Sequence, residues 1–197
     1  MANWCENILI VKGEKEDLKG FKKQFNGYPV IWPPEGSEAH GKTQEEVGEL
    51  IRKKKEEILK RGPRPSFNAL YPVPKFIISQ GYDRLGYNWC NKNWGVKSDI
   101  YYMDIGIREE DDFIEYYFDT PWNPPEKWVE NVSKMFPQLI FEIIYQEDGM
   151  CFCGRTVYEK GEKLESEYYQ YGDEEYIPFM KKHFGEESLE FILENLG

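Results

Sequence analysis

The residues best suited to chemistry or recognition lie between Asn88 and Gly95, where two indoles, three side-chain amides and a thiol occur together. Aromatic walls with directional amide hydrogen bonds suit the recognition of a base, a sugar or a peptide. Almost no helix or strand periodicity is visible here, so we predict a loop with a binding surface. Its predicted site residues are Trp89, Cys90, Asn91, Asn93, Trp94, Gly95, Asp99 and Trp122.

The same residues also admit a structural interpretation. Trp94 and Gly95 could cap the core, and the asparagine side chains could satisfy backbone groups of the loop. A nucleophilic role for Cys90 is disfavoured, because a base would have to come from His40 or His183, both far away in the sequence. We therefore assign no catalytic residue.

Aspartates provide an alternative function, a metal-dependent enzyme that acts on nucleic acid. Asp99, Asp104 and Asp119 lie on or beside two segments with strand patterns, and such carboxylates can hold Mg²⁺ or Mn²⁺. Asp99 and Asp104 are five positions apart, so a regular strand would place them on opposite faces. Gly81 and Gly86 have the Walker spacing, but no Lys-Ser/Thr follows them. We expect neither a bound metal nor a cofactor.

Composition indicates a folded protein of the cytoplasm. Of the 197 residues, 40% are hydrophobic and 16% aromatic, enough to form a core. No apolar run approaches the length of a membrane span, and the first residues lack a signal-peptide pattern. The four cysteines fit that compartment as reduced thiols, and they form neither a C-x-x-C motif nor a Cys/His spacing. A zinc site built from all four would require the fold to gather them.

Charge is distributed unevenly along the chain. The net charge is −11, with −12 on residues 63–197 and +1 on residues 1–62. An acidic body repels phosphate backbones, so nucleic-acid binding is disfavoured. The basic run in residues 52–55 could contact a phosphate backbone, although a solvated helix face explains it as well. A protein partner with a basic surface is compatible with this charge, as is a simple role in solubility.

The order of expected elements indicates an α+β fold. We expect a strand at 7–11, a helix at 14–25, two strands at 100–107 and 113–118, a helix after Asn123, and strands at 138–145 and 150–158. This order is the ferredoxin-like split β-α-β plan, an antiparallel sheet with helices on one face. Residues 1–160 would form this domain. Residues 27–65 would be a helical insertion whose helix starts at a capping box of Thr43 and Glu46. Residues 66–71 would be a strand end or an edge element, and residues 161–197 a C-terminal helical extension that docks on the body.

Several linked motifs resemble a known family. They are the opening Asn3-Trp4-Cys5-x-Asn7, then Tyr71-Pro72-x-Pro74, Trp89-Cys90-x-x-Asn93-Trp94-Gly95, Phe118-x-Thr120-x-Trp122-x-Pro124-Pro125, Tyr145-x-Glu147 and Gly154. Together they resemble the YubB-type proteins of plasmids and phages, over residues 1–160 without the insertion. The resemblance implies a ferredoxin-like domain of mobile genetic elements. It implies no established activity and no agreed catalytic residue.

The function we expect is therefore a non-enzymatic accessory protein that binds a protein partner through the Trp/Asn segment, residues 88–95. The metal-dependent enzyme remains the alternative. A third interpretation is a homo-oligomer in which exposed, tyrosine-rich strands pair across a two-fold axis.

Overall fold

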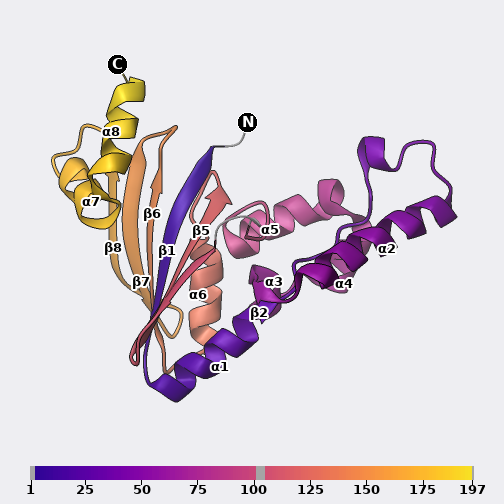
Figure 1. Cartoon of the computed structure of the whole chain (residues 1–197), viewed down its shortest axis with the longest axis horizontal. Helices are drawn as coiled ribbons and strands as arrows, with labels where there is room; N and C mark the ends of the chain where they lie inside the picture. Colours follow the sequence, from indigo (N-terminus) through magenta and orange to yellow (C-terminus); the bar gives the residue numbers. More distant parts are fainter. Residues whose placement is uncertain (1–2, 101–104, 197) are drawn as a thin grey trace.

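A computed structural model describes residues 3–100 and 105–196, and its centre is a six-stranded antiparallel sheet (Figure 1). The strand order is β4-β5-β1-β6-β7-β8. The strands are β1 (Trp4–Lys12), β4 (Gly106–Glu109), β5 (Phe113–Pro121), β6 (Ile140–Glu147), β7 (Phe152–Glu159) and β8 (Glu162–Gln170). A separate two-stranded sheet pairs β2 (Asn26–Gly27) with β3 (Arg64–Pro65).

The first four strands of the sheet and two helices form the ferredoxin-like plan. In chain order these are β1, α1 (Lys15–Phe25), β4, β5, α6 (Glu126–Met135) and β6. β1 pairs antiparallel with both β5 and β6, which gives the order β4-β5-β1-β6 of a split β-α-β fold. The predicted fold class is confirmed. β7 and β8 then extend the sheet beyond β6.

The main core lies between the sheet and the two helices of that plan. Phe21 and Phe25 of α1 and Trp128 of α6 are fully buried. The ring of Phe25 lies 5.0 Å from Trp128 and 5.1 Å from Tyr116 of β5, measured between centroids. Such tilted and edge-on contacts are favourable for aromatic rings. On β1, alternate side chains such as Leu9 point into this core, which defines the inner face of the sheet.

The C-terminal helices cover the opposite, outer face (Figure 1). They are α7 (Tyr176–His183) and α8 (Gly185–Leu196), and their buried residues include Tyr176, Met180 and Leu189. These pack against Ile144 and Cys153 of the sheet. Helices therefore lie on both faces, with the ferredoxin-like pair on one side and the extension on the other.

The sheet continues into the segment that we assigned to the C-terminal extension. A boundary at residue 160 would fall between β7 and β8, which pair along their length. β8 was missed because almost all its side chains are exposed, so no apolar alternation marks it.

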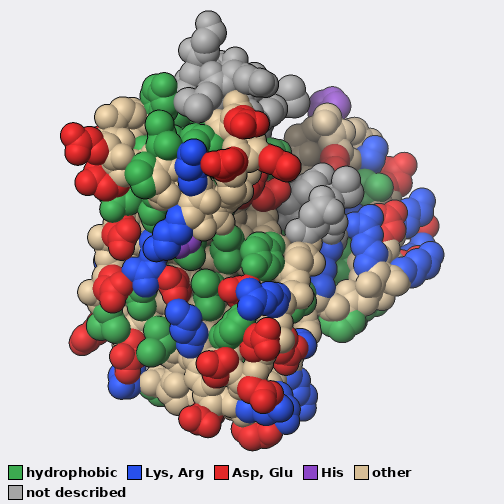
Figure 2. All heavy atoms as spheres, turned by 60° about the vertical axis from the view of Figure 1, so that its left-hand side comes forward, with side chains coloured by type: hydrophobic (Ala, Val, Ile, Leu, Met, Phe, Trp, Pro, Cys, Tyr) green, Lys and Arg blue, Asp and Glu red, His purple; other side chains and the backbone are tan. Residues whose placement is uncertain are grey.

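The insertion forms an arm that projects away from the sheet (Figure 1). Its main helix, α2 (Gln44–Arg61), begins with the predicted capping box. Thr43 Oγ1 accepts a bond from the Glu46 amide at 3.3 Å, and Glu46 accepts one from the Thr43 amide at 2.7 Å. No residue of α2 is buried, and basic side chains gather on this arm at the right of Figure 2. A short helix, η1 (Gly36–Glu38), precedes it.

The segment between the insertion and β4 is helical where we expected a strand end. It contains α3 (Phe67–Leu70), α4 (Lys75–Gln80), a π-helical turn η2 (Tyr82–Gly86) and α5 (Tyr87–Trp94). The expected strand at 100–107 is described only as β4, because residues 101–104 lie outside the described ranges. In the described part of the chain, no helix is both long and apolar enough to span a bilayer.

Candidate functional site

The Trp/Asn segment is a helix, α5, and not the predicted loop. The amide of Asn91 donates to the Tyr87 carbonyl at 2.7 Å, and that of Asn93 donates to the Trp89 carbonyl at 2.8 Å. These side chains thus bond their own helix, one turn back. Tertiary packing explains the helix better than local propensity does, because Cys90 and Trp94, four positions apart, are both buried on its core side.

Trp94 belongs to the core and does not line an open surface. Its side chain is fully buried, and its indole nitrogen donates to the Tyr71 carbonyl at 2.9 Å. Trp89 is half-buried, stacked on Tyr71 and edge-on against Trp94 at 5.5 Å. Gly95 ends α5 in the left-handed conformation at φ 84°, where glycine is favoured. The expectation that both indoles of the segment face outward is therefore corrected.

Cys90 and Asp99 also serve the structure. Burial, followed by the charge of Asp99, raises the pKa of the Cys90 thiol to about 12, so the thiolate needed by a nucleophile is not formed near neutral pH. The Asp99 carboxylate accepts bonds from Ser66 Oγ at 2.7 Å, the Phe67 amide at 2.6 Å and the Ile100 amide at 2.9 Å. Burial raises the pKa of Asp99, while these bonds oppose the rise. Asp99 therefore caps α3.

The aspartates of the alternative function are not brought together. Asp119 pairs in register with Glu6, and both are exposed on the outer face of the sheet. Asp99 lies on the inner side beside α3, and Asp104 lies outside the described residues. Within residues 3–100 and 105–196, no group of three or more His, Cys, Asp or Glu side chains is arranged to hold a metal ion.

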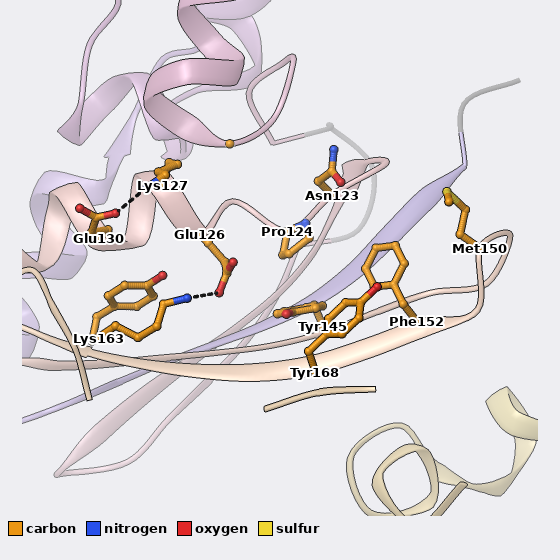
Figure 3. Close-up of a pocket in the computed structure, with 12 residues that line it drawn as sticks. Asn123, Pro124, Glu126, Lys127, Glu130, Tyr145, Met150, Phe152, Lys163 and Tyr168 are labelled. Carbon is orange, nitrogen blue, oxygen red and sulfur yellow. Dashed lines mark hydrogen bonds and ion pairs between the residues drawn. The ribbon is translucent and has the colours of Figure 1, made fainter. Parts of the chain in front are cut away.

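A hollow lies between α6 and the strands β6, β7 and β8, and we call it the α6/β8 groove (Figure 3). Its volume is about 610 Å³, within the usual range for ligand sites. Four aromatic residues line it. They are Tyr145, Phe152, Tyr158 and Tyr168, and the remaining lining residues are Gly95, Asn123, Pro124, Glu126, Lys127, Glu130, Met150 and Lys163.

Three of the rings form a continuous aromatic surface. The Phe152 ring lies 6.2 Å from Tyr145 at 69° and 5.9 Å from Tyr168 at 29°, between centroids. Tyr145 and Phe152 are buried, while Tyr168 is 53% exposed and forms the outer wall. Met150, 63% exposed, stands at one end of the groove (Figure 3). The groove therefore offers ring faces to a ligand that enters from solvent.

Glu126 supplies negative charge beside these rings. It accepts a bond from Thr156 Oγ1 at 2.5 Å, and its carboxylate lies 3.7 Å from Lys163 Nζ. The Lys163 ammonium also lies 5.7 Å from the centroid of the Tyr158 ring. Burial first, and then the charge of Glu126, raises the pKa of both Tyr145 and Tyr158, so both phenols remain protonated. The groove thus already holds one ammonium group between a carboxylate and an aromatic ring.

A second carboxylate, Glu130, lies farther along α6. It is paired with Lys127 at 3.1 Å and with Lys134 at 3.0 Å. Burial alone would raise the pKa of Glu130, but hydrogen bonds from the two lysines outweigh this effect and lower it. The two lysines already balance the charge of Glu130. Glu126 is therefore the carboxylate of the groove that a ligand can use.

Sequence reasoning missed most of this groove. Its residues come from α6 and three strands, separated by long stretches of chain, and no local pattern unites them. Two features did point toward it. Pro124 and Tyr145 stand among the motifs of the family resemblance, and Gly95 belongs to both the predicted site and the groove.

Comparison with known proteins agrees with this architecture. Residues 100–188 match the family model described as the ferredoxin-like domain in Api92-like protein. These residues are similar to that domain. The matched part contains β4 to β8, α6 and α7, and therefore nearly the whole α6/β8 groove. The family resemblance read from the sequence is confirmed.

Two known proteins are similar to this chain. The uncharacterized protein YubB of Escherichia coli (strain K12) is 38% identical over 80 residues, 40% of this chain and 54% of YubB, so the match spans about half of that relative. The crystal structure of Api92 from Yersinia pseudotuberculosis has a TM-score of 0.58 at 13% identity, covering 88% of this chain and 100% of that one. At this identity the likeness shows the shared fold.

Proposed function

We propose that this protein is a non-enzymatic binding module whose α6/β8 groove holds a basic side chain of a protein partner. The observation that carries the proposal is the position of Lys163, whose ammonium lies between Glu126 and the Tyr158 ring. The same pair of groups suits the ammonium or guanidinium of another protein, since ring faces and carboxylates both attract cations.

An incoming cation can displace the Lys163 ammonium from Glu126. The lysine side chain is 47% exposed, and its separation of 3.7 Å from Glu126 is longer than that of a direct hydrogen bond. An exposed ion pair of this kind contributes about 0 to 1 kcal/mol. A ligand that also contacts the rings of Tyr145 and Tyr168 would add cation–π attraction of about 0.5 to 2 kcal/mol. The exchange is therefore energetically feasible.

The negative charge of residues 63–197 supports a basic partner. Residues 63–197, which contain the groove, carry a net charge of −12, so they attract a basic protein and repel a phosphate backbone. On the α7/α8 side shown in Figure 2, acidic and basic side chains are mixed and form no broad basic patch. The resemblance to plasmid- and phage-borne proteins supports an accessory role on a mobile element.

The proposed site keeps part of the site predicted from sequence. Gly95 lines the groove, and Trp122, 40% exposed, directly precedes the groove residue Asn123. The Lys97 ammonium lies 6.0 Å from the centroid of the Trp122 ring, which supports this ring as a further contact for a cation. Cys90 and Trp94 are omitted because both are fully buried.

Calorimetric titration with a synthetic peptide of alternating lysine and threonine tests the proposal. We expect Glu126→Gln and Tyr168→Ala each to weaken binding about tenfold, because each removes a group that faces the cation. Tyr28→Ala is the matched control, since Tyr28 is an exposed tyrosine of the insertion, outside the groove. Absence of binding, or equal binding of a glutamate–threonine peptide, would contradict the proposal.

A further inference from the structure

β8 is an edge strand that borders the groove. It has nine residues and pairs with β7 on one side. Among the strands of the described structure, none pairs with its other side. An unpaired strand edge presents backbone N–H and C=O groups that an extended peptide can bind.

The hydrogen bonds at the end of β8 establish which residues face the open side. The Tyr171 amide donates to Cys151 on the β7 side at 2.9 Å. The Gln170 amide instead donates to the Asp173 carboxylate at 2.7 Å, and the Gln170 carbonyl accepts from the Asp173 amide at 3.0 Å. Because backbone groups alternate sides along a strand, Ser166 and Tyr168 direct theirs to the open edge, as Gln170 does.

The open stretch is short and bounded at both ends. Asp173 occupies both backbone groups of Gln170, which closes one end. At the other end the register with β7 shifts, so that Leu164 is an extra residue in β8. Such bulges interrupt pairing along an edge. The regular edge therefore consists of Ser166 and Tyr168, enough for a short segment and too little for unrestricted sheet growth.

The open edge and the groove share one face of the sheet. Ser166 lies opposite Thr156, and Tyr168 lies opposite Gly154, which places both side chains on the groove side. The hydroxyls of Ser166 and Thr156 are 3.4 Å apart, and Thr156 donates to Glu126. A long basic side chain on a strand beside β8 would therefore extend over the small Ser166 toward Glu126.

We propose that an extended, basic segment of the partner protein adds to β8 as an antiparallel seventh strand, pairs with Ser166 and Tyr168, and directs a lysine or arginine toward Glu126. This rests on the proposed function, and it specifies how the partner binds. Charge favours a basic segment, because residues 162–175 contain six carboxylates and one lysine. Opposite charges on neighbouring strands stabilise pairing.

Backbone methylation of the peptide provides the sharpest test. In the proposed pairing, a lysine opposite Ser166 has its side chain over the groove and its amide toward β8. A lysine–threonine peptide methylated on its lysine amides should therefore bind the full chain about tenfold more weakly, while methylation of the threonine amides should leave binding unchanged. In the complex with the unmodified peptide, the amides of Ser166 and Tyr168 should exchange with solvent more slowly.

A variant on the protein side complements these peptides. Ser166→Pro removes an amide that faces the open edge and should weaken binding about tenfold, while Ser166→Thr should not. If the proline variant fails to fold, the methylated peptides decide. Equal binding of all three peptides, with Glu126→Gln still weakening it, would overturn strand addition and leave the groove function intact. If none of the three peptides binds, both strand addition and the groove function are overturned.

Discussion

The Tyr145 ring lies against the bare Cα of Gly154, its cross-strand partner on β7. A methyl group at Gly154 would stand 2.5 Å from the Tyr145 hydroxyl and 2.6 Å from the Glu167 carbonyl oxygen. Glycine therefore leaves room for the Tyr145 side chain to extend over β7, where its ring lines the groove. The shape of the groove depends on this contact.

Gly154→Ala should both destabilise the protein and weaken binding to the groove. The added methyl group must displace the Tyr145 ring or the β8 backbone, and overpacking of this kind costs about 1 to 3 kcal/mol. Urea denaturation measures the change in the free energy of unfolding. Gly20→Ala is the control, because a methyl group at Gly20 in α1 would meet nothing within 4 Å and should stabilise the helix by up to about 1 kcal/mol. Equal stability of the two variants would contradict the role of Gly154.

The two tryptophans Trp94 and Trp122 should respond differently to substitution. Trp94→Ala removes a fully buried ring and should lower the free energy of unfolding by about 3 to 5 kcal/mol. Trp122→Ala, at a position 40% exposed, should change it by less than about 1 kcal/mol. Thermal or urea unfolding of both variants distinguishes core from surface. A stable Trp94→Ala variant would refute the structural role assigned to this ring.

Asp99→Asn should destabilise the start of α3. The substitution weakens the acceptors for Ser66, Phe67 and Ile100, and the loss of a helix cap costs about 0.5 to 2 kcal/mol. Asp112→Asn, in the exposed turn between β4 and β5, should have little effect on the same unfolding measurement. If both variants unfold at the same urea concentration as the parent, Asp99 is not the cap.

Acid should remove the stabilisation that Glu142 provides on the outer face. Burial alone would raise the pKa of Glu142, but hydrogen bonds from Lys12 and Arg155 outweigh it and hold the pKa below its ordinary value of 4.5. Because the folded-state pKa is lowered, the stabilisation is present above 4.5 and is lost as the pH falls through the folded-state value.

Unfolding free energies measured between about pH 6 and pH 3 should therefore fall less steeply for Glu142→Gln than for the parent protein. Glu165→Gln, whose side chain is 61% exposed, should follow the parent closely. A Glu142→Gln curve parallel to that of the parent would show that Glu142 is not responsible for the acid sensitivity.

Local patterns were sufficient to predict the framework of the fold. The apolar run of β1 and the spacing of Leu18, Phe21 and Phe25 in α1 gave correct elements, because each buries one defined face. The capping box at Thr43 likewise located the start of α2. The helix expected after Asn123 begins at Glu126, a difference of a few residues at its boundary.

The candidate site was harder to predict, because long-range contacts determine it. Asp99 stabilises α3 from more than thirty positions away, so its carboxylate resembled a free functional group in the sequence. α5 becomes helical through the burial of Cys90 and Trp94, which local propensity does not indicate. β8 carries few apolar residues, and Tyr168 joins Tyr145 only through the pairing of β7 with its two neighbours.

The most direct test of the proposed binding site is to follow the ring protons of Tyr145, Phe152 and Tyr168 by NMR during titration with the lysine–threonine peptide. If a basic side chain enters the groove, these signals should shift together and saturate, and the shifts should be lost in Glu126→Gln. Ring signals that stay unchanged while the peptide binds elsewhere, or shifts that persist without the Glu126 carboxylate, would contradict it.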